Sequence, residues 1–245
     1  MATLAPLEGI HHLTAISADA QRTIDFYSTL LGQRLVKRTV NFDDPASHHL
    51  YFADEEHGPG AITFFAWPGA PRGNYGIGGT HHVAYATANR DTLRQWKRYL
   101  TDNRVAVTGP YDRVYFESIY FTDPDGTILE IATDGPGWSI DEAPDALGTG
   151  YRQPPPEVVV RNRDESAIQA RTWPEPVPVV TAAMALDLGM HHISAISSNI
   201  EKTHEFLSGV LGLRRVKMTS NFDDPSSPHW YWGAGDGRPG TIITY

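Results

Sequence analysis

Short segments in which apolar residues alternate with polar ones, and in which β-branched residues are common, predict β-strands along most of the chain. Three of these segments open on a pair of histidines, and a predicted helix follows each of them. Helical spacing of apolar residues is seen at Ile24, Tyr27 and Leu30 and again at Leu93, Trp96 and Tyr99. The predicted order of a strand, a helix and three strands occurs twice before residue 135 and begins a third time at Gly189.

The first and third of these units are copies of each other. Residues 9–65 align without a gap with residues 189–245, and 26 of the 57 positions are identical. GIHHLTAIS in the first unit returns as GMHHISAIS in the third, and NFDDP at 41–45 returns as NFDDP at 221–225. Such a repeat indicates a duplicated structural unit, and we interpret NFDDP as a structural loop within it.

The units divide the chain into modules of βαβββ order. Their boundaries are residues 9–66 for the first module, 80–134 for the second, 135–186 for a proline-rich connector and 187–245 for the third. We predict that the first two modules form one domain over residues 1–134. The connector has the composition of a linker, with one short helix near residues 165–171. The third module ends before a partner module appears, which indicates a shortened chain or a module completed by another subunit.

Composition narrows the class of protein. The 245 residues are 40% hydrophobic and include no cysteine, which excludes disulfides, thiolate metal sites and cysteine nucleophiles. No apolar run is long enough to span a membrane, and the first residues do not resemble a signal peptide, so we expect a cytoplasmic protein. The net charge of -9 argues against nucleic acid or an anionic membrane as partner. A small molecule is the expected ligand.

Histidine pairs are the strongest chemical signal. Eight of the eleven histidines form four pairs, and three pairs open a module at equivalent places. Adjacent side chains on a strand point to opposite faces, so at most one histidine of each pair faces a given cavity. The fourth pair, His48 and His49, lies later in its module, and we interpret it as ordinary.

A carboxylate stands on another predicted strand, where Glu130 lies between Leu129 and Ile131. Two histidines and one carboxylate that converge from separate strands, with other coordination positions open, are the ligands of non-haem Fe(II) oxygenases. The sequence therefore predicts a metal site made by histidines that open two modules and by Glu130.

The module order, the histidine strands and the segment YFTDPDGTILEIATD resemble the vicinal oxygen chelate superfamily, which includes glyoxalase I, bleomycin-binding proteins and extradiol dioxygenases. Within it, GIHHLTAIS, FDDP, GTHHVAYA and DRVYFESIYFTDPDGTILEIATDGPGW resemble the ring-cleaving dioxygenases that act on hydroquinones. This resemblance covers nearly all of the chain except the connector. It implies an α+β fold of tandem βαβββ modules, whose curved mixed sheets surround a metal cavity and whose helices lie outside.

In that family the second histidine of a pair binds iron and the first lies behind it. The resemblance implies His12 and His82 as metal ligands, with His11 and His81 behind them, and Glu130 as the carboxylate ligand. The implied metal is Fe(II), with Mn(II) as the alternative.

Three further residues match the family. Thr14 lies two residues beyond His12 on the same strand face, and Tyr120 lies on the strand before that of Glu130. Arg113 matches a family arginine that could stabilise negative charge on a phenolate. The resemblance implies that these three and the outer histidines take part in catalysis.

The sequence permits two ways of completing the site. The first and second modules could close it with His12, or the second and third could close it with His192. We prefer the first arrangement because consecutive units joined by short connections usually pack together.

We therefore expect an Fe(II)-dependent dioxygenase that uses dioxygen to cleave a hydroquinone or catechol-type ring. One alternative is a glyoxalase-like, metal-dependent isomerase or lyase, although AITFFAW at the end of the first module lacks the second carboxylate that this class needs. The other alternative is a metal-free module that binds and sequesters a small molecule. The unpaired third module would expose a sheet edge, which favours a homodimer formed through it.

Overall fold

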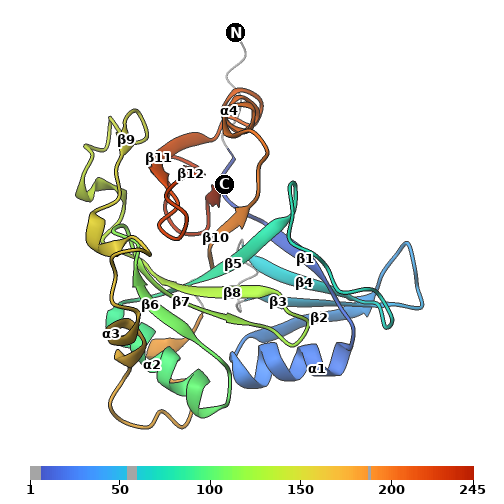
Figure 1. The fold of residues 1–245 in the computed structure, drawn as a ribbon. Helices are drawn as coiled ribbons and strands as arrows, with labels where there is room; N and C mark the ends of the chain where they lie inside the picture. Colours follow the sequence, from blue (N-terminus) through green and yellow to red (C-terminus); the bar gives the residue numbers. More distant parts are fainter. Residues whose placement is uncertain (1–6, 54–59, 187–188) are drawn as a thin grey trace.

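The structure is a computed structural model that describes residues 7–53, 60–186 and 189–245. Within these residues the strands form two mixed sheets, one of four strands and one of nine (Figure 1). The sheets curve, and short helices lie along their outer sides. The predicted α+β class built from tandem βαβββ modules is confirmed.

The first module forms the four-stranded sheet, in the order β1-β4-β3-β2. Its elements are β1 (His12–Ser17), α1 (Ala20–Ile24), the π-helical segment η1 (Asp25–Leu30), β2 (Arg34–Val40), β3 (His48–Ala53) and β4 (Ala61–Ala66). The Asp19 carboxylate caps α1 by accepting a hydrogen bond from the backbone N–H of Arg22 at 2.9 Å. Gly32 follows η1 with a φ of 72°, a left-handed conformation that suits glycine and ends the helix.

The second module has the same topology. It consists of β5 (Thr80–Thr87), α2 (Arg90–Asp102), β6 (Thr108–Asp112), β7 (Glu117–Thr122) and β8 (Ile128–Thr133). Strand β5 runs parallel to β8, as β1 runs parallel to β4. A capping box between Asn89 and Thr92 begins α2, and the helix buries Leu93, Trp96 and Tyr99 as their spacing predicts.

The third module repeats the pattern again. It consists of β10 (Met190–Ala195), α4 (Ile200–His204), the π-helical segment η5 (Glu205–Val210), β11 (Arg214–Ser220), β12 (Pro228–Gly233) and β13 (Ile242–Thr244). Its first strand again runs parallel to its last, because β10 pairs with β13. The duplication read from the sequence therefore appears as a repeated topology.

We expected the first and second modules to close the site together, but the strands pair the second module with the third. Strand β5 of the second module pairs antiparallel with β10 of the third, so these two modules share the nine-stranded sheet. Strand β1 of the first module lies at an edge of the separate four-stranded sheet. The third module therefore has a partner within the chain, which removes the reason for expecting a homodimer through an unpaired third module.

The connector packs along the third module and is not only a spacer between the second and third modules. Strand β9 (Tyr151–Arg152) of the connector pairs with β11. The indole N–H of Trp138 donates to the carbonyl of Gly237 at 2.7 Å. Buried Lys217 forms ion pairs with Asp141 at 2.6 Å and with Glu142. Composition alone suggests a linker, but these contacts bind the connector along the third module.

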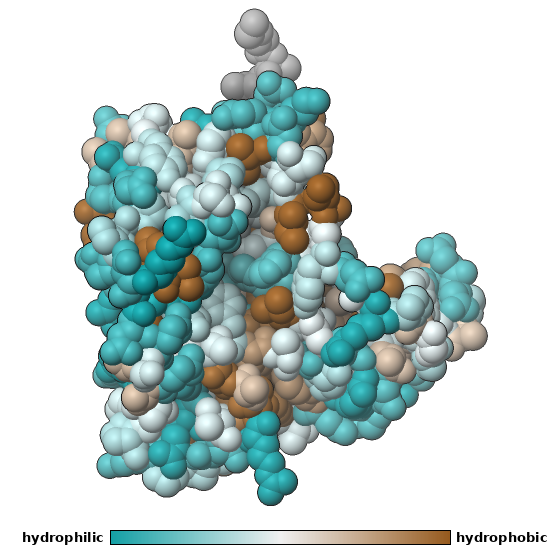
Figure 2. All heavy atoms as spheres, viewed as in Figure 1, coloured by the Kyte–Doolittle hydropathy of each residue, from teal (hydrophilic) through white to brown (hydrophobic). Residues whose placement is uncertain are grey.

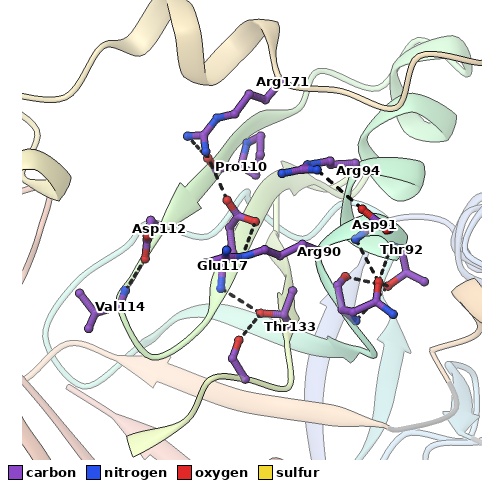
Figure 3. Close-up of polar contacts among 12 residues, drawn as sticks. Arg90, Asp91, Thr92, Arg94, Pro110, Asp112, Val114, Glu117, Thr133 and Arg171 are labelled. Carbon is purple, nitrogen blue, oxygen red and sulfur yellow. Dashed lines mark hydrogen bonds and ion pairs between the residues drawn. The ribbon is translucent and has the colours of Figure 1, made fainter. Parts of the chain in front are cut away.

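The other end of the connector binds the second module. Helix α3 (Glu165–Ala170) confirms the short helix expected near residues 165–171. After it, the guanidinium of Arg171 lies 3.4 Å from buried Glu117 on β7 and donates to the carbonyl of Pro110 at 3.2 Å (Figure 3). Arg90 at the start of α2 approaches the other oxygen of Glu117 at 3.4 Å. The connector therefore bridges the two modules that share a sheet.

The largest hydrophobic cluster lies between the first and second modules. Tyr27, Phe52 and Phe64 of the first module belong to the same buried cluster as Tyr85 and Trp96 of the second. The first and second modules thus share a core, which agrees with the rule that consecutive units joined by short connections pack together. The shared sheet, however, joins the second module to the third.

The exterior is mainly polar in the view of Figure 2, with apolar residues gathered near its middle. The longest helix of the described residues, α2, has 13 residues. Among the described residues, no helix has both the length and the apolar character needed to cross a membrane.

Candidate metal centre

Strand register brings three ligand residues to one point. On β5 and β8, Ala84 lies opposite Glu130, and on β5 and β10, Ala84 lies opposite His192. His82 is two residues before Ala84 and therefore projects from the same face of the sheet. Three neighbouring strands thus place His82, Glu130 and His192 together, although 110 positions separate the two histidines in the sequence.

The three side chains are close and buried. The Nε2 atoms of His82 and His192 lie 2.9 and 3.3 Å from Oε2 of Glu130, and 3.3 Å from each other. Glu130 is 0% exposed, His192 2% and His82 8%. Within the described chain, these three form the group of His, Asp and Glu side chains whose geometry suits a metal ion.

The charge of the group also suits a cation. Burial opposes ionisation of Glu130, but the imidazoles of His192 and His82 hold the pKa of this carboxyl well below its usual value. Burial also lowers the pKa of His82 from its usual value, despite the adjacent carboxylate, so this imidazole is neutral near pH 7. A buried carboxylate that faces two imidazole nitrogens is an arrangement that a bound divalent cation would stabilise.

Hydrogen-bond geometry supports the same conclusion. Neither oxygen of Glu130 has a hydrogen-bond partner of suitable geometry among the described residues, although both histidine nitrogens are near. This arrangement is expected where three ligand atoms are directed at a shared centre rather than at one another. The residues present therefore fit a metal ion with two imidazole ligands and one carboxylate ligand.

Each histidine of this group contacts the histidine before it. The Nδ1 atoms of His81 and His82 lie 2.8 Å apart, and so do those of His191 and His192. A hydrogen bond at Nδ1 leaves Nε2 free to face a metal and fixes the orientation of the ring. His81 thus contacts His82, and His191 contacts His192 in the same way.

A cavity of about 700 Å³ opens beside this group. His82, His192, Arg113 and Tyr120 contribute to its lining. The phenol oxygen of Tyr120 accepts hydrogen bonds from Arg113 at 3.3 Å and from Ser118 at 3.2 Å. The phenol proton remains available to a ligand in the cavity. Burial, the largest effect, raises the pKa of Tyr120 above its usual value, so the phenol is protonated near neutral pH.

The remaining candidate residues lie elsewhere. His11, His12 and Thr14 are exposed on or beside β1, in the four-stranded sheet. The Nδ1 atoms of His11 and His12 contact each other at 2.8 Å, as in the other pairs, and Thr14 accepts a hydrogen bond from Thr63 at 2.9 Å. The structure does not bring His12 to His82 and Glu130. Because β10 rather than β1 pairs with β5, His192 occupies that position.

Several cavity residues were missed in the sequence. His229 and Tyr231 on β12 line the cavity and form a hydrogen bond of 3.2 Å, and His229 also contacts Thr244 at 3.1 Å. The signal was present, because His49 and Tyr51 are their counterparts in the first module and form the same contact at 2.9 Å. Because we interpreted His49 as a residue without a special role, we did not consider its counterpart His229 as a cavity residue. Arg163 and Asp223 also line the cavity.

Comparison with known proteins identifies the class. The model of the Glyoxalase/Bleomycin resistance protein/Dioxygenase superfamily matches residues 9–131, which is half of the chain. The chain belongs to this superfamily, as its repeated modules and the buried His-Glu-His group indicate.

Similar curated proteins are named as ring-cleaving enzymes. The "Putative ring-cleaving dioxygenase MhqO" of Bacillus subtilis is 33% identical over 215 residues, which cover 87% of this chain and 57% of that protein. The chlorohydroquinone/hydroquinone 1,2-dioxygenase of Sphingobium indicum is 35% identical over 136 residues, which cover 53% of this chain and 42% of that protein. The chain spans about half the length of these curated relatives.

Solved structures agree on the fold. A crystal structure of a "putative dioxygenase" from Bacillus subtilis has a TM-score of 0.67 and 29% identity, covering 98% of this chain and 63% of that one. Glyoxalase I from Zea mays has a TM-score of 0.59 with 16% identity, covering 96% of this chain and 66% of that one. The second similarity concerns the fold alone.

Proposed function

We propose that this chain is an Fe(II)-dependent dioxygenase that cleaves the ring of a hydroquinone or catechol-type compound. His82, Glu130 and His192 are the proposed metal ligands. The observation that carries the proposal is their convergence as a buried group beside a cavity that also presents Tyr120 and Arg113. The names of the similar curated proteins support the reaction class.

The donor set supports iron. Two imidazoles and one carboxylate leave coordination positions open for other ligands, which is the arrangement of non-haem Fe(II) oxygenases. When bound, such a metal supplies Lewis-acid and redox chemistry. A module that only sequestered a small molecule would not need a buried carboxylate between two histidines.

The cavity residues can manage charge and protons. Burial opposes the charge of Arg113, but Tyr120, Asp223 and Glu130 outweigh it and raise the pKa of this guanidinium above its usual value. Its guanidinium would stabilise negative charge that develops on a phenolic substrate. The Tyr120 phenol and the imidazole of His81, which both line the cavity, would hold or transfer substrate protons.

Oxygen consumption tests the proposal. The protein is loaded with Fe(II) without air, and uptake of dioxygen is measured after hydroquinone or catechol is added. Glu130→Gln keeps the shape of the side chain but removes its charge, so we expect a loss of more than about 100-fold in rate, beyond that usual for supporting residues. Undiminished uptake by this variant would show that the assigned site is wrong.

A further inference from the structure

We infer that Asp223, in the second copy of the NFDDP loop, and Arg163, in the connector, are positioning residues that hold Arg113 against Tyr120. This inference rests on the proposed function and adds two residues to its site. It gives the repeated loop and the connector a part in catalysis that the sequence did not indicate.

The contacts converge on one carboxylate. An Nη atom of Arg113 lies 2.8 Å from one oxygen of Asp223, and an Nη atom of Arg163 lies 2.6 Å from the other. The same Nη atom of Arg113 donates to the Tyr120 phenol at 3.3 Å. Asp223 thus stands between two guanidinium groups, one of which contacts a proposed catalytic phenol.

Three parts of the chain meet here. Arg113 follows β6 of the second module, Asp223 follows β11 of the third, and Arg163 precedes α3 of the connector. Arg163 also lies over the ring of Tyr111, with its guanidinium carbon 4.3 Å from the ring centre. All four side chains line the cavity beside the candidate metal centre.

Electrostatics favour a fixed arrangement. Burial would raise the pKa of Asp223, but Arg113 and Arg163 outweigh this and hold the pKa of the carboxyl below its usual value. Asp223 is therefore ionised at neutral pH and separates two like charges. Without its charge the two guanidinium groups would repel each other, and Arg113 would lose the partner that orients it.

The loop itself does not need the carboxylate of Asp223. In this copy, Asn221 accepts from the backbone N–H of Asp223 at 2.9 Å, and Asp224 accepts from the hydroxyl of Ser227. In the first copy, Asn41 accepts from the backbone N–H of Asp43 at 3.1 Å, and Asp44 accepts from Ser47. The turn is thus built by the first and fourth residues of NFDDP. The third residue is free for another role.

The first module provides a matched control. Asp43 has the same place in the same motif, but it is exposed on the separate four-stranded sheet, away from the candidate metal centre. Asp43→Asn and Asp223→Asn are therefore the same change in the same loop. They differ in whether an arginine of the cavity lies beside the carboxylate.

The test compares catalysis with the mobility of Arg113. Oxygen uptake with hydroquinone gives kcat and KM, and NMR of the metal-free protein labelled with ¹⁵N-arginine reports rotation of the guanidinium groups, with the Arg113 signal assigned from Arg113→Lys. We expect Asp223→Asn to lower kcat by about 10- to 100-fold, the range usual for supporting residues, with little change in KM. We also expect it to average the separate Nη signals of Arg113. Arg163→Gln should change both readouts in the same direction, and Asp43→Asn should change neither.

Combining substitutions sharpens the test. If Asp223 acts through Arg113, Asp223→Asn should lower kcat no further once Arg113→Gln is present, because residues that act as a unit are not additive. Independent losses in the double variant would overturn the inference. So would an unchanged Arg113 NMR signal in Asp223→Asn, or an unchanged kcat.

The two proposals fail in different ways. If the unsubstituted protein consumes no dioxygen with these substrates, the proposed function fails. The NMR comparison then decides alone whether Asp223 and Arg163 hold Arg113.

Discussion

Side chains at the candidate metal centre keep their usual charge states at neutral pH although they are buried. Glu130 is ionised although it is 0% exposed, and His82 is neutral beside it. Arg113 keeps its charge because Tyr120, Asp223 and Glu130 raise its pKa against the effect of burial. The carboxylate and the neutral imidazole suit a bound cation, and the guanidinium of Arg113 suits a negatively charged oxygen.

His191 gives a pH dependence that can be measured without metal. Burial lowers its pKa from 6.5 to about 3, so the folded protein keeps the imidazole neutral. The unfolded chain, with a pKa of about 6.5, binds one more proton between these values. The contribution of His191 to the free energy of unfolding is therefore fully present above about pH 6.5. It is lost as the pH falls below this value, by up to about 1.4 kcal/mol per pH unit.

Replacing His191 with phenylalanine removes the titrating group and keeps a ring beside Phe116, whose ring centre is 5.1 Å away. We expect the free energy of unfolding in urea to fall less steeply between pH 6.5 and 5 in His191→Phe, by about 1 kcal/mol per pH unit. The same change at His48, which is exposed, is the control for replacing a histidine with phenylalanine. Equal slopes for His191→Phe and the unsubstituted protein would contradict this explanation.

At the scale of elements, periodicity and repeats predicted much of the fold. Alternation located the strands, and the spacing of Leu93, Trp96 and Tyr99 located the buried face of α2. The sequence placed Glu130 on a strand between Leu129 and Ile131, and the structure buries its side chain on β8. The gapless alignment is one residue out of register at the last strand. Thr63 lies opposite Thr14 in the first module, whereas Thr244, one position beyond the aligned residue, lies opposite Ser194 in the third.

Sheet pairing could not be predicted, for a physical reason. Alternation shows which face of a strand is apolar, but it contains no information about which edge of the strand hydrogen bonds to another module. The prolines of the connector indicated a linker, yet the side chains that bind it, such as Trp138 and Arg171, show no periodic pattern. His12 was preferred over His192 because consecutive modules usually pack together, and the pairing of β10 with β5 departs from that rule.

The two NFDDP loops provide a direct comparison at this scale. Phe222 is 5% exposed, and the connector covers its backbone, since the N–H of Val160 donates to the Phe222 carbonyl at 2.9 Å. Phe42, its copy, is 86% exposed. We expect Phe222→Ala to lower the free energy of unfolding by about 3 kcal/mol and Phe42→Ala by less than about 0.5 kcal/mol. Urea denaturation of both variants measures this, and equal losses would show that the connector does not bury Phe222 in solution.

At the scale of the whole molecule, one duplicated module is used in two ways. The first module contributes to the shared core, and its histidine strand β1 stays at the edge of its sheet. The third module has the same strand order, but the connector holds it beside the second module, where its histidine faces Glu130. His192 and His12 lie in similar local sequences, and they differ in whether their strand pairs with β5 beside Glu130.

Iron bound per chain after anaerobic loading and removal of free metal tests this account most directly. His12→Gln and His192→Gln make the same change at equivalent places in the repeat. The account predicts that the unsubstituted protein and His12→Gln each retain one iron per chain, and that His192→Gln retains much less. Retention of iron by His192→Gln together with its loss from His12→Gln would contradict the account.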